Sequence, residues 1–545
     1  MIKHSDGSIY LELNSRIGAI NLDGTTRTFI SEDDFKNALK GFRLLGALTA
    51  LGSLSNKIYG GEIPNGWERL GKGLIRQKET GLLISQSMIE YLENLFIISG
   101  SNDFKTLSIT EKDNLLGLFN IYQHSLVIGS IQRKNVISIM VSLWQEQLRT
   151  QANDLQSIGR TIYMFQKLDR EIIKNQTLTK ILHDNSGLTI EEYLNAALVL
   201  LACALVNPII IIGDLSSDSI NFQKIINNSI LERFLILFSA TYDEFRSIDS
   251  TQNIALAPKD TRNRFNPLWK KPLIKFSESK FLVPSIPTYI QAAFNGLFWW
   301  FDDLFMKKQF GHEISKTTFR EIFGKEIFEQ YVGLILGDIF GDSHLTPEII
   351  YGGKGKKAFT DWVVVDGDDA YLVEVKAYQF PFKTLQTGDL EMVAHEIAKK
   401  LTIDTIQKLD NKILDINTSA ELNFLKGKNL IPVVITYNVP LIDTNLYRHG
   451  MKDILDNKTY KIFSEFNGYF LNIADLESFK LISKATKLKN VLLLARTNNS
   501  NFYAEITKIL KSGEGPWPQS LPERQYHERM DYITTMLGSD KLEKL

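Results

Sequence analysis

The sequence predicts an α/β protein of more than one domain, with a mainly helical N-terminal region followed by an α/β domain. Apolar residues recur with helical spacing over most of the first three hundred residues. Residues 359–378, FTDWVVVDGDDAYLVEVKAY, contain two Val-rich runs around a Gly/Asp turn, which is typical of a β-hairpin. A further apolar run, Leu430–Tyr437, is typical of a buried strand.

Composition and charge narrow the class of protein. The chain has 545 residues, of which 44% are hydrophobic and 23% charged, as in ordinary globular proteins. Its net charge of −1 provides no global basic field, so nucleic-acid binding would need a local basic patch. The single cysteine, Cys203, excludes a disulfide within the chain and fits a reducing cytoplasm.

No membrane segment is expected. The N-terminus lacks the apolar stretch of a signal peptide. The strongest apolar stretch, residues 196–212, is interrupted by Asn207 and Pro208 and is too short to span a bilayer comfortably. We interpret it as a buried helix followed by a short extended run, and expect a cytoplasmic protein without a membrane partner.

The N-terminal region is expected to begin with a weak hairpin, in which residues 9–13 pair with residues 18–22. From Ser31, a capping signal, apolar residues keep a helical period as far as Leu48. No Walker A loop or GxGxxG motif occurs, so a nucleotide-driven motor is not expected. Further helices are predicted at 80–99, 109–150, 153–174, 190–206, 220–247 and 286–307.

One stretch of this region mixes basic and aromatic side chains. Arg262 and Arg264 precede Trp269, and such a stretch can contact phosphates and bases of a nucleic acid. A loop whose charges are merely solvated is the alternative.

A boundary is expected near residue 310, where polar residues and Gly311 separate two helical patterns. It divides the chain into domains 1–310 and 311–545. The second domain is expected to open with a helix over 317–340 and a strand over 348–351. After the hairpin we expect helices at 389–415, 475–487, 503–511 and 519–545, and strands at 430–437, 469–473 and 491–495.

The hairpin gathers charged residues at its open end. If Asp366 faces Asp369, Asp361 lies opposite Glu374, with the two Cβ atoms roughly 5 Å apart. Lys376, two residues on, shares the face of Glu374. The strands are otherwise apolar, so charges there are costly unless paired or bound to a metal. The alternative is a solvated pair of Glu374 and Lys376 on an edge hairpin.

Two carboxylates at this separation can share a Mg²⁺ ion, which prefers oxygen ligands and keeps several waters. Such an ion acidifies a bound water and stabilises charge on a phosphoryl oxygen. Lys376 can orient or deprotonate the attacking water, or neutralise developing negative charge. The trio therefore points to hydrolysis of a phosphate ester.

Asp361 followed by Glu374-Val375-Lys376 on the next strand resembles the PD-(D/E)xK nuclease superfamily. Thr360 stands where the family often has Pro. The resemblance covers residues 317–440 and implies a restriction-endonuclease-like αβββαβ core with a mixed sheet. It also implies that Asp361, Glu374 and the Val375 carbonyl hold Mg²⁺, for which Mn²⁺ is expected to substitute.

The resemblance implies two further contributions to the site. A Glu of the first helix often points at the metal, and Glu329 is the candidate, with Glu326 as the second choice. A Gln or Lys often comes from the helix after the hairpin. Gln407, Lys399 and Lys400 are the candidates there, and the sequence does not decide among them.

A Gly-rich basic loop leads to Asp361. Residues 352–357 hold three glycines together with Lys354, Lys356 and Lys357. Such a loop can approach a phosphate backbone closely, so it is expected to bind nucleic acid. A flexible, solvated turn is the alternative.

By family analogy, the expected function is that of a Mg²⁺-dependent DNA endonuclease in restriction or antiviral defence. The N-terminal region would supply substrate choice, homo-oligomerisation or a surface for a partner protein. One alternative is a ribonuclease that uses the same site. Another is a non-catalytic protein that binds nucleic acid or serves assembly, against which the intact trio of Asp361, Glu374 and Lys376 argues.

Overall fold

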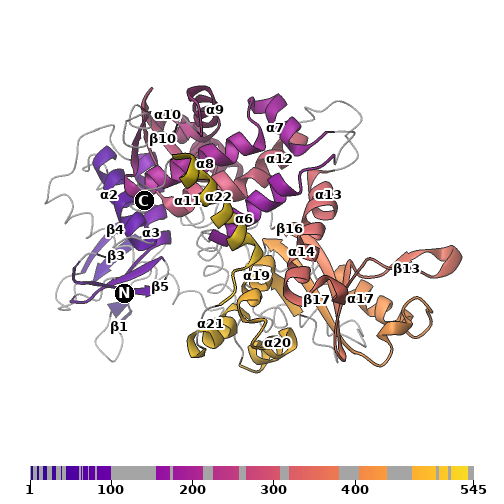
Figure 1. Cartoon of the computed structure of the whole chain (residues 1–545). Helices are drawn as coiled ribbons and strands as arrows, with labels where there is room; N and C mark the ends of the chain where they lie inside the picture. Colours follow the sequence, from indigo (N-terminus) through magenta and orange to yellow (C-terminus); the bar gives the residue numbers. More distant parts are fainter. Residues whose placement is uncertain are drawn as a thin grey trace. The chain divides into compact units, whose positions relative to one another are not determined.

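The computed structural model confirms the α/β class, since it contains both helices and mixed or antiparallel sheets (Figure 1). The expected helix at 109–150 and the residues Arg262, Arg264, Lys399 and Lys400 lie outside the described residues. The structure describes residues 2–3, 9–10, 16–20, 27–31, 39, 44–59, 63, 65–71, 73–79, 83–99, 155–171, 176–212, 222, 225–256, 266–306, 318–379, 404–438, 469–498, 502–513 and 517–537.

The chain forms two compact units, which we describe separately. Unit 1 comprises residues 1–153, 186–296 and 533–545, and unit 2 comprises residues 154–185 and 297–532. The domain division at residue 310 stays a prediction.

Unit 1 packs helices against small sheets. Its described helices are α2 (Leu44–Tyr59), α3 (Gln86–Ser99), α8 (Ile190–Val206), α9 (Asn228–Phe238), α10 (Tyr242–Leu256) and α11 (Ile286–Ile290), with η5 (Pro267–Trp269) and η6 (Gln291–Asn295). Its described strands are β1 (Ile2–Lys3), β2 (Ile9–Tyr10), β3 (Arg16–Ile20), β4 (Arg27–Ser31), β5 (Trp67–Gly71), β6 (Leu74–Gln77), β7 (Leu83–Ser85), β8 (Ile209–Ile211), β9 (Ser239–Ala240), β10 (Leu273–Ser277) and β11 (Lys280–Leu282).

Helix α8 confirms the interpretation of the most apolar stretch. The Thr189 side chain accepts a hydrogen bond from the Glu192 N–H, while Glu192 bonds back to the Thr189 N–H, and this capping box fixes the start. Asn207 ends the helix, and the short strand β8 follows. Among the described residues, no single helix has the length and apolar character needed to cross a membrane, although α7 (Leu178–Ser186) and α8 pass that test together as a bent pair.

Several expectations for unit 1 were wrong. Among the described residues of the expected pairing of 9–13 with 18–22, residues 9–10 pair with 2–3 and residues 18–20 pair with 27–29 instead. A single helix at 220–247 is also wrong, because α9 ends before Ser239 and α10 begins at Tyr242. The sheet β5-β6-β7 and the hairpin β10-β11 were not expected. Their strands are short and polar enough that no alternating pattern stands out.

Unit 2 is built on a mixed sheet with the strand order β12-β15-β16-β17-β18; its strands β16 and β17 are labelled in Figure 1. The β12-β15 and β15-β16 pairs are antiparallel, and β16-β17 and β17-β18 are parallel. The strands are β12 (Leu345–Pro347), β15 (Trp362–Asp366), β16 (Asp369–Gln379), β17 (Asn429–Asn438) and β18 (Tyr469–Asn472).

Each of the remaining described helices lies wholly or mostly within unit 2. They are α6 (Leu155–Ile162), η1 (Tyr163–Lys167), α7 (Leu178–Ser186), α12 (Gly296–Met306), α13 (Phe319–Ile322), η7 (Phe323–Phe328), α14 (Glu329–Phe340), η8 (Asp342–His344), η9 (Gly353–Gly355), α17 (Asp404–Asp415), η11 (Asn423–Leu425), α19 (Ile473–Ile482), α20 (Leu488–Thr497), α21 (Phe502–Ser512) and α22 (Leu521–Leu537).

Helix α17 covers one face of the sheet beside the hairpin. Residues alternate between the two faces along β16. Ala370 and Leu372 pack in one apolar cluster with Ile413 of α17 and with Ile416, which directly follows the helix. Glu374 is two residues further along the same strand and therefore faces the α17 side.

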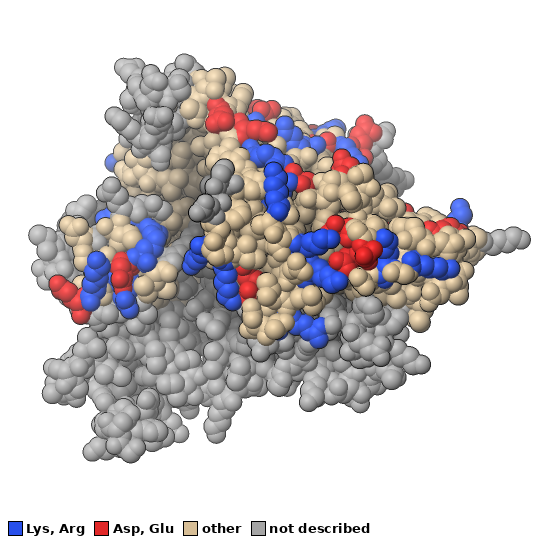
Figure 2. Space-filling model, turned by 60° about the horizontal axis from the view of Figure 1, so that its bottom comes forward, with Lys and Arg blue, Asp and Glu red and all other residues tan. Residues whose placement is uncertain are grey.

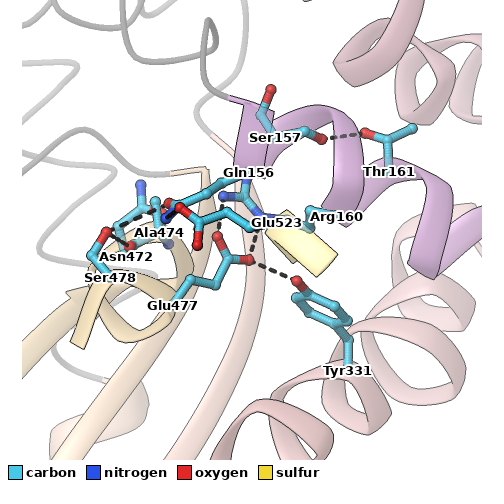
Figure 3. Close-up of polar contacts among 10 residues, drawn as sticks. All are labelled: Gln156, Ser157, Arg160, Thr161, Tyr331, Asn472, Ala474, Glu477, Ser478 and Glu523. Atoms are coloured by element: carbon cyan, nitrogen blue, oxygen red, sulfur yellow. Dashed lines mark hydrogen bonds and ion pairs between the residues drawn. The ribbon is translucent and has the colours of Figure 1, made fainter. Parts of the chain in front are cut away.

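A buried ion pair joins α6 to the sheet-covering helices of unit 2. The Arg160 guanidinium donates two hydrogen bonds to the Glu477 carboxylate, 2.7 and 2.6 Å long. The Tyr331 hydroxyl donates to the same carboxylate at 2.8 Å (Figure 3). Because Glu477 is fully buried, its charge would be costly without partners, and Arg160 and Tyr331 stabilise it.

Two expectations for unit 2 were wrong. The first strand of the sheet is β12, and Ile350–Tyr351 (β13) pairs instead with Lys357–Ala358 (β14) in a separate hairpin. Residues 491–495 were expected to form a strand but lie within α20. Val491, Leu492 and Ala495 are the buried residues there. Ala495 comes four residues after Val491 and three after Leu492, which places all three on one face of a helix.

Candidate active site

The hairpin has the register expected from its turn. Asp366 pairs with Asp369, and Trp362 pairs with Val373. Strand pairing ends at Trp362, so Asp361 lies just before β15, opposite the end of the apolar part of β16. The Asp361 Oδ2 accepts a hydrogen bond of 2.6 Å from the Val375 N–H, which holds this carboxylate against the segment 374–376.

Trp362 also ties the hairpin to α14. Its indole Nε1 donates a 3.0 Å hydrogen bond to the Glu329 carbonyl oxygen. A Cβ atom at Gly333, one turn further along α14, would overlap the Trp362 ring, so glycine is required for this approach. The contact places Glu329 beside the open end of the hairpin.

Glu374 lies at the centre of the site. Only 3% of its side chain is exposed, and two ammonium groups contact its carboxylate. Lys376 donates to Oε2 at 2.9 Å, and Lys412 of α17 donates to Oε1. Lys412 also donates a 2.7 Å hydrogen bond to the Phe359 carbonyl oxygen. The structure thus brings Asp361, Glu374 and Lys376 together and adds Lys412 to them.

Lys412 was missed by sequence reasoning. The candidates on this helix were Lys399, Lys400 and Gln407; the first two lie outside the described residues, and so does the side chain of Gln407. The helical spacing of the apolar residues carried a usable signal. Lys412 lies three residues after Leu409 and next to Ile413, both buried, so it is at the edge of the sheet-facing side.

The acidic groups differ in how their proton affinities are set. Burial and, to a smaller extent, the negative charge of Glu374 raise the pKa of Asp361 to about 6, against the lowering effects of Lys376, the Val375 N–H and Lys412. Burial also raises the pKa of Glu374, but the charges of Lys376 and Lys412 outweigh burial and keep that pKa below its usual value. The site therefore holds one carboxylate that stays ionised and one that protonates readily.

Glu329 and Lys376 belong to the same electrostatic environment. Burial raises the pKa of Glu329 to about 7, helped by the charges of Asp361 and Glu348. Burial lowers the pKa of Lys376, but Glu374 and Asp361 outweigh this and raise it above its usual value. Glu326, the second choice on the first helix, instead pairs with Arg170 at 2.9 Å.

The donor set suits a hard divalent cation that keeps part of its water shell. Among the described residues, no group of three His, Cys, Asp or Glu side chains is arranged to hold a metal ion. Asp361 and Glu374 offer two carboxylates, and the backbone carbonyl of Val375, the next residue along the chain after Glu374, is the third oxygen that the sequence motif suggests. Mg²⁺ commonly binds through one or two carboxylates plus waters. Because the negative charge of Glu374 raises the pKa of Asp361, a cation between the two carboxylates would relieve their repulsion.

The Gly-rich loop forms the tip of the β13-β14 hairpin. Gly352 and Gly353 have φ angles of +88° and +59°, the left-handed region that favours glycine. The Lys357 ammonium lies 3.0 Å from the Asp415 carboxylate at the end of α17, and Tyr351 donates to the same carboxylate at 2.6 Å. Lys356 is exposed, and the side chain of Lys354 lies outside the described residues.

Surface charges are mixed. On the face drawn in Figure 2, basic and acidic side chains lie interspersed over the described part of the chain. This agrees with the net charge of −1. An anionic polymer such as a nucleic acid would therefore have to be attracted by local basic groups. The three lysines of the 352–357 loop remain the candidates for that role in unit 2.

Comparison of the chain with family models, with curated proteins and with solved structures gave no match.

Proposed function

We propose that unit 2 is a metal-dependent nuclease that hydrolyses phosphodiester bonds, with DNA as the substrate. The observation that carries the proposal is the buried Glu374 carboxylate, which lies with Asp361 and Lys376 at the open end of one hairpin. Buried charges of this kind are costly, and their clustering with perturbed proton affinities is characteristic of functional sites.

The residues divide into ligands and proton-handling groups. Asp361, Glu374 and the Val375 carbonyl would hold Mg²⁺ or Mn²⁺, which when bound lowers the pKa of a water and offsets charge on the phosphoryl oxygens. Lys376 keeps its proton at neutral pH because its pKa is raised. It therefore acts as a donor that orients the attacking water or stabilises the negative charge of the transition state.

Glu329 is suited to accept a proton. With a pKa of about 7, a useful fraction of its carboxylate is ionised at neutral pH, and it still binds a proton strongly enough to act as a general base. Positioned on α14 beside the hairpin, Glu329 would receive the proton from the attacking water. Lys376 and Glu329 then have distinct roles, donor and acceptor.

The remaining parts of the proposal concern binding and context. Lys354, Lys356 and Lys357 would contact the phosphate backbone. The N-terminal region, residues 1–310, would supply substrate choice or a surface for a second copy or another protein. We also propose a cytoplasmic location, which is supported by the single cysteine. The proposed role in restriction or antiviral defence rests on the resemblance of the sequence motif.

The test is a substrate panel. The purified protein is incubated with plasmid DNA, single-stranded DNA and RNA, with Mg²⁺, with Mn²⁺ and with EDTA. Cleavage of DNA that requires a divalent ion is the expected result. Cleavage of RNA alone would make the protein a ribonuclease, and binding without cleavage of any substrate would make it a non-catalytic nucleic-acid-binding protein.

A further inference from the structure

The carboxylate of Glu374 is fully engaged by two cations from different elements. Lys376 comes from the same strand and contacts Oε2 at 2.9 Å. Lys412 comes from α17 and contacts Oε1. Only 18% of the Lys412 side chain is exposed, so its ammonium is largely withdrawn from water and is held by Glu374 and the Phe359 carbonyl.

A metal ion at this carboxylate would meet competition from Lys412. Two positive groups cannot bind one oxygen together without strong repulsion, particularly where little water separates them. Asp361 can still bind the ion through the lone pairs left free by the Val375 N–H, but it does not move Lys412 off Glu374. Lys376 is fixed two residues from Glu374 on the same strand, whereas Lys412 reaches the site from a separate helix.

We propose that Lys412 gates metal binding: its ammonium occupies Glu374 in the free protein, and a divalent cation binds when this ammonium moves off. The inference rests on the proposed nuclease function, and it concerns the regulation of that site. The freed ammonium stays beside the site through the Phe359 carbonyl, where a phosphate group of the nucleic acid is a suitable counter-ion.

The gate couples metal and substrate. A phosphate that pairs with Lys412 removes the competitor from Glu374, so nucleic acid raises the affinity for metal, and metal raises the affinity for nucleic acid by the same factor. Helix α17 links Lys412 to the expected phosphate-binding hairpin, because Asp415 at the end of this helix contacts Tyr351 and Lys357 of that hairpin. Metal alone is then held weakly.

The experiment measures Mn²⁺ binding without nucleic acid, so it needs no cleavage. Free Mn²⁺ is followed by electron paramagnetic resonance during titration of the full chain and of its variants. Lys412→Gln is expected to bind Mn²⁺ about tenfold more tightly than the parent protein, a difference of about 1.4 kcal/mol. Lys412→Arg, which keeps a cation at this position, is expected to bind as weakly as the parent.

The control is Lys408→Gln. Lys408 is exposed and lies one turn earlier on α17, so the variant loses the same charge without losing a contact to Glu374. Its Mn²⁺ affinity is expected to match that of the parent. Thermal unfolding in EDTA checks that each variant folds, and Lys412→Met, which keeps the apolar stem, replaces the Gln variant if that one does not fold.

Two results would overturn the proposal in different ways. If Lys412→Gln binds Mn²⁺ no better than Lys408→Gln, while Asp361→Asn loses binding, the metal site exists but Lys412 does not gate it. If neither the parent nor any variant shows Mn²⁺ binding that depends on Asp361, the proposed metal site itself is wrong and the gate fails with it.

Discussion

The ion pair between Arg160 and Glu477 allows a prediction about stability that can be worked from the contacts. The two side chains are 10% and 0% exposed, and the pair is bidentate. Removing one partner of such a pair leaves an uncompensated buried charge and costs about 3–5 kcal/mol. In Arg160→Met the Tyr331 hydroxyl still donates to Glu477, so we expect the lower end, about 3 kcal/mol.

For a unit of this size, a loss of about 3 kcal/mol lowers the midpoint of thermal unfolding by roughly 6–12 °C. Differential scanning calorimetry of the full chain measures the shift in the transition of unit 2. The control is Arg170→Met, because Arg170 pairs with Glu326 on the surface, where both side chains are well exposed. Such pairs contribute about 0–1 kcal/mol, so this variant is expected to unfold near the parent midpoint.

A second variant separates the charge from the packing. Arg160→Met combined with Glu477→Leu removes both charges, and replacement of a buried pair by apolar groups is often close to neutral. The double variant is therefore expected to recover most of the lost stability. The reasoning is refuted if Arg160→Met shifts the midpoint no more than Arg170→Met does, or if the double variant is less stable than Arg160→Met.

Three further predictions concern catalysis, pH and binding. Lys376→Ala is expected to lower the single-turnover cleavage rate by at least ~100-fold with little change in nucleic-acid affinity; a normal rate with lost affinity would make Lys376 a phosphate contact instead. Burial raises the pKa of Asp475 from 3.8 to about 7, so the folded protein keeps this carboxyl protonated at pH values where the unfolded chain ionises it. The stability contributed by the protonated carboxyl is therefore complete below pH 4 and is lost as the pH rises through 7, by up to ~4 kcal/mol. Asp475→Asn should remove that part of the pH dependence of the free energy of unfolding, measured in urea. An unchanged pH profile would show that Asp475 does not cause it. Replacing Lys354, Lys356 and Lys357 together by Ala should flatten the dependence of log affinity on log salt by ~1–3, at about 0.9 for each phosphate neutralised, whereas an unchanged slope would indicate a solvated turn.

The elements predicted well are those whose signals are local. The register of the hairpin follows from its own turn, Asp366 to Asp369, because a one-residue slip would turn every side chain to the other face. Helix α8 carries its start and stop signals within its own sequence. Strand β17 is buried on both faces and therefore reads as an uninterrupted apolar run.

The elements that were missed depend on distant partners. A short apolar run at 491–495 suits a strand or a buried helix equally, and packing within unit 2 decides for α20. Tyr351 pairs with Lys357 rather than with the main sheet, a choice set by the left-handed turn at Gly352 and Gly353. The helical spacing places Lys412 at the edge of the sheet-facing side of α17, but its contact with Glu374 depends on how α17 packs on the sheet, which spacing along the chain does not specify.

The central claim is that Asp361 and Glu374 form a metal-dependent hydrolytic site, and one rate comparison tests it most directly. Single-turnover cleavage of plasmid DNA in Mg²⁺ is measured for the parent, for Asp361→Asn and for Asp368→Asn. Asp368 is an exposed aspartate in the turn at the closed end of the same hairpin, so its variant is a matched control. The account predicts that Asp361→Asn abolishes cleavage while the fold and the rate of Asp368→Asn are unchanged. Equal cleavage rates in Asp361→Asn and the parent would contradict it.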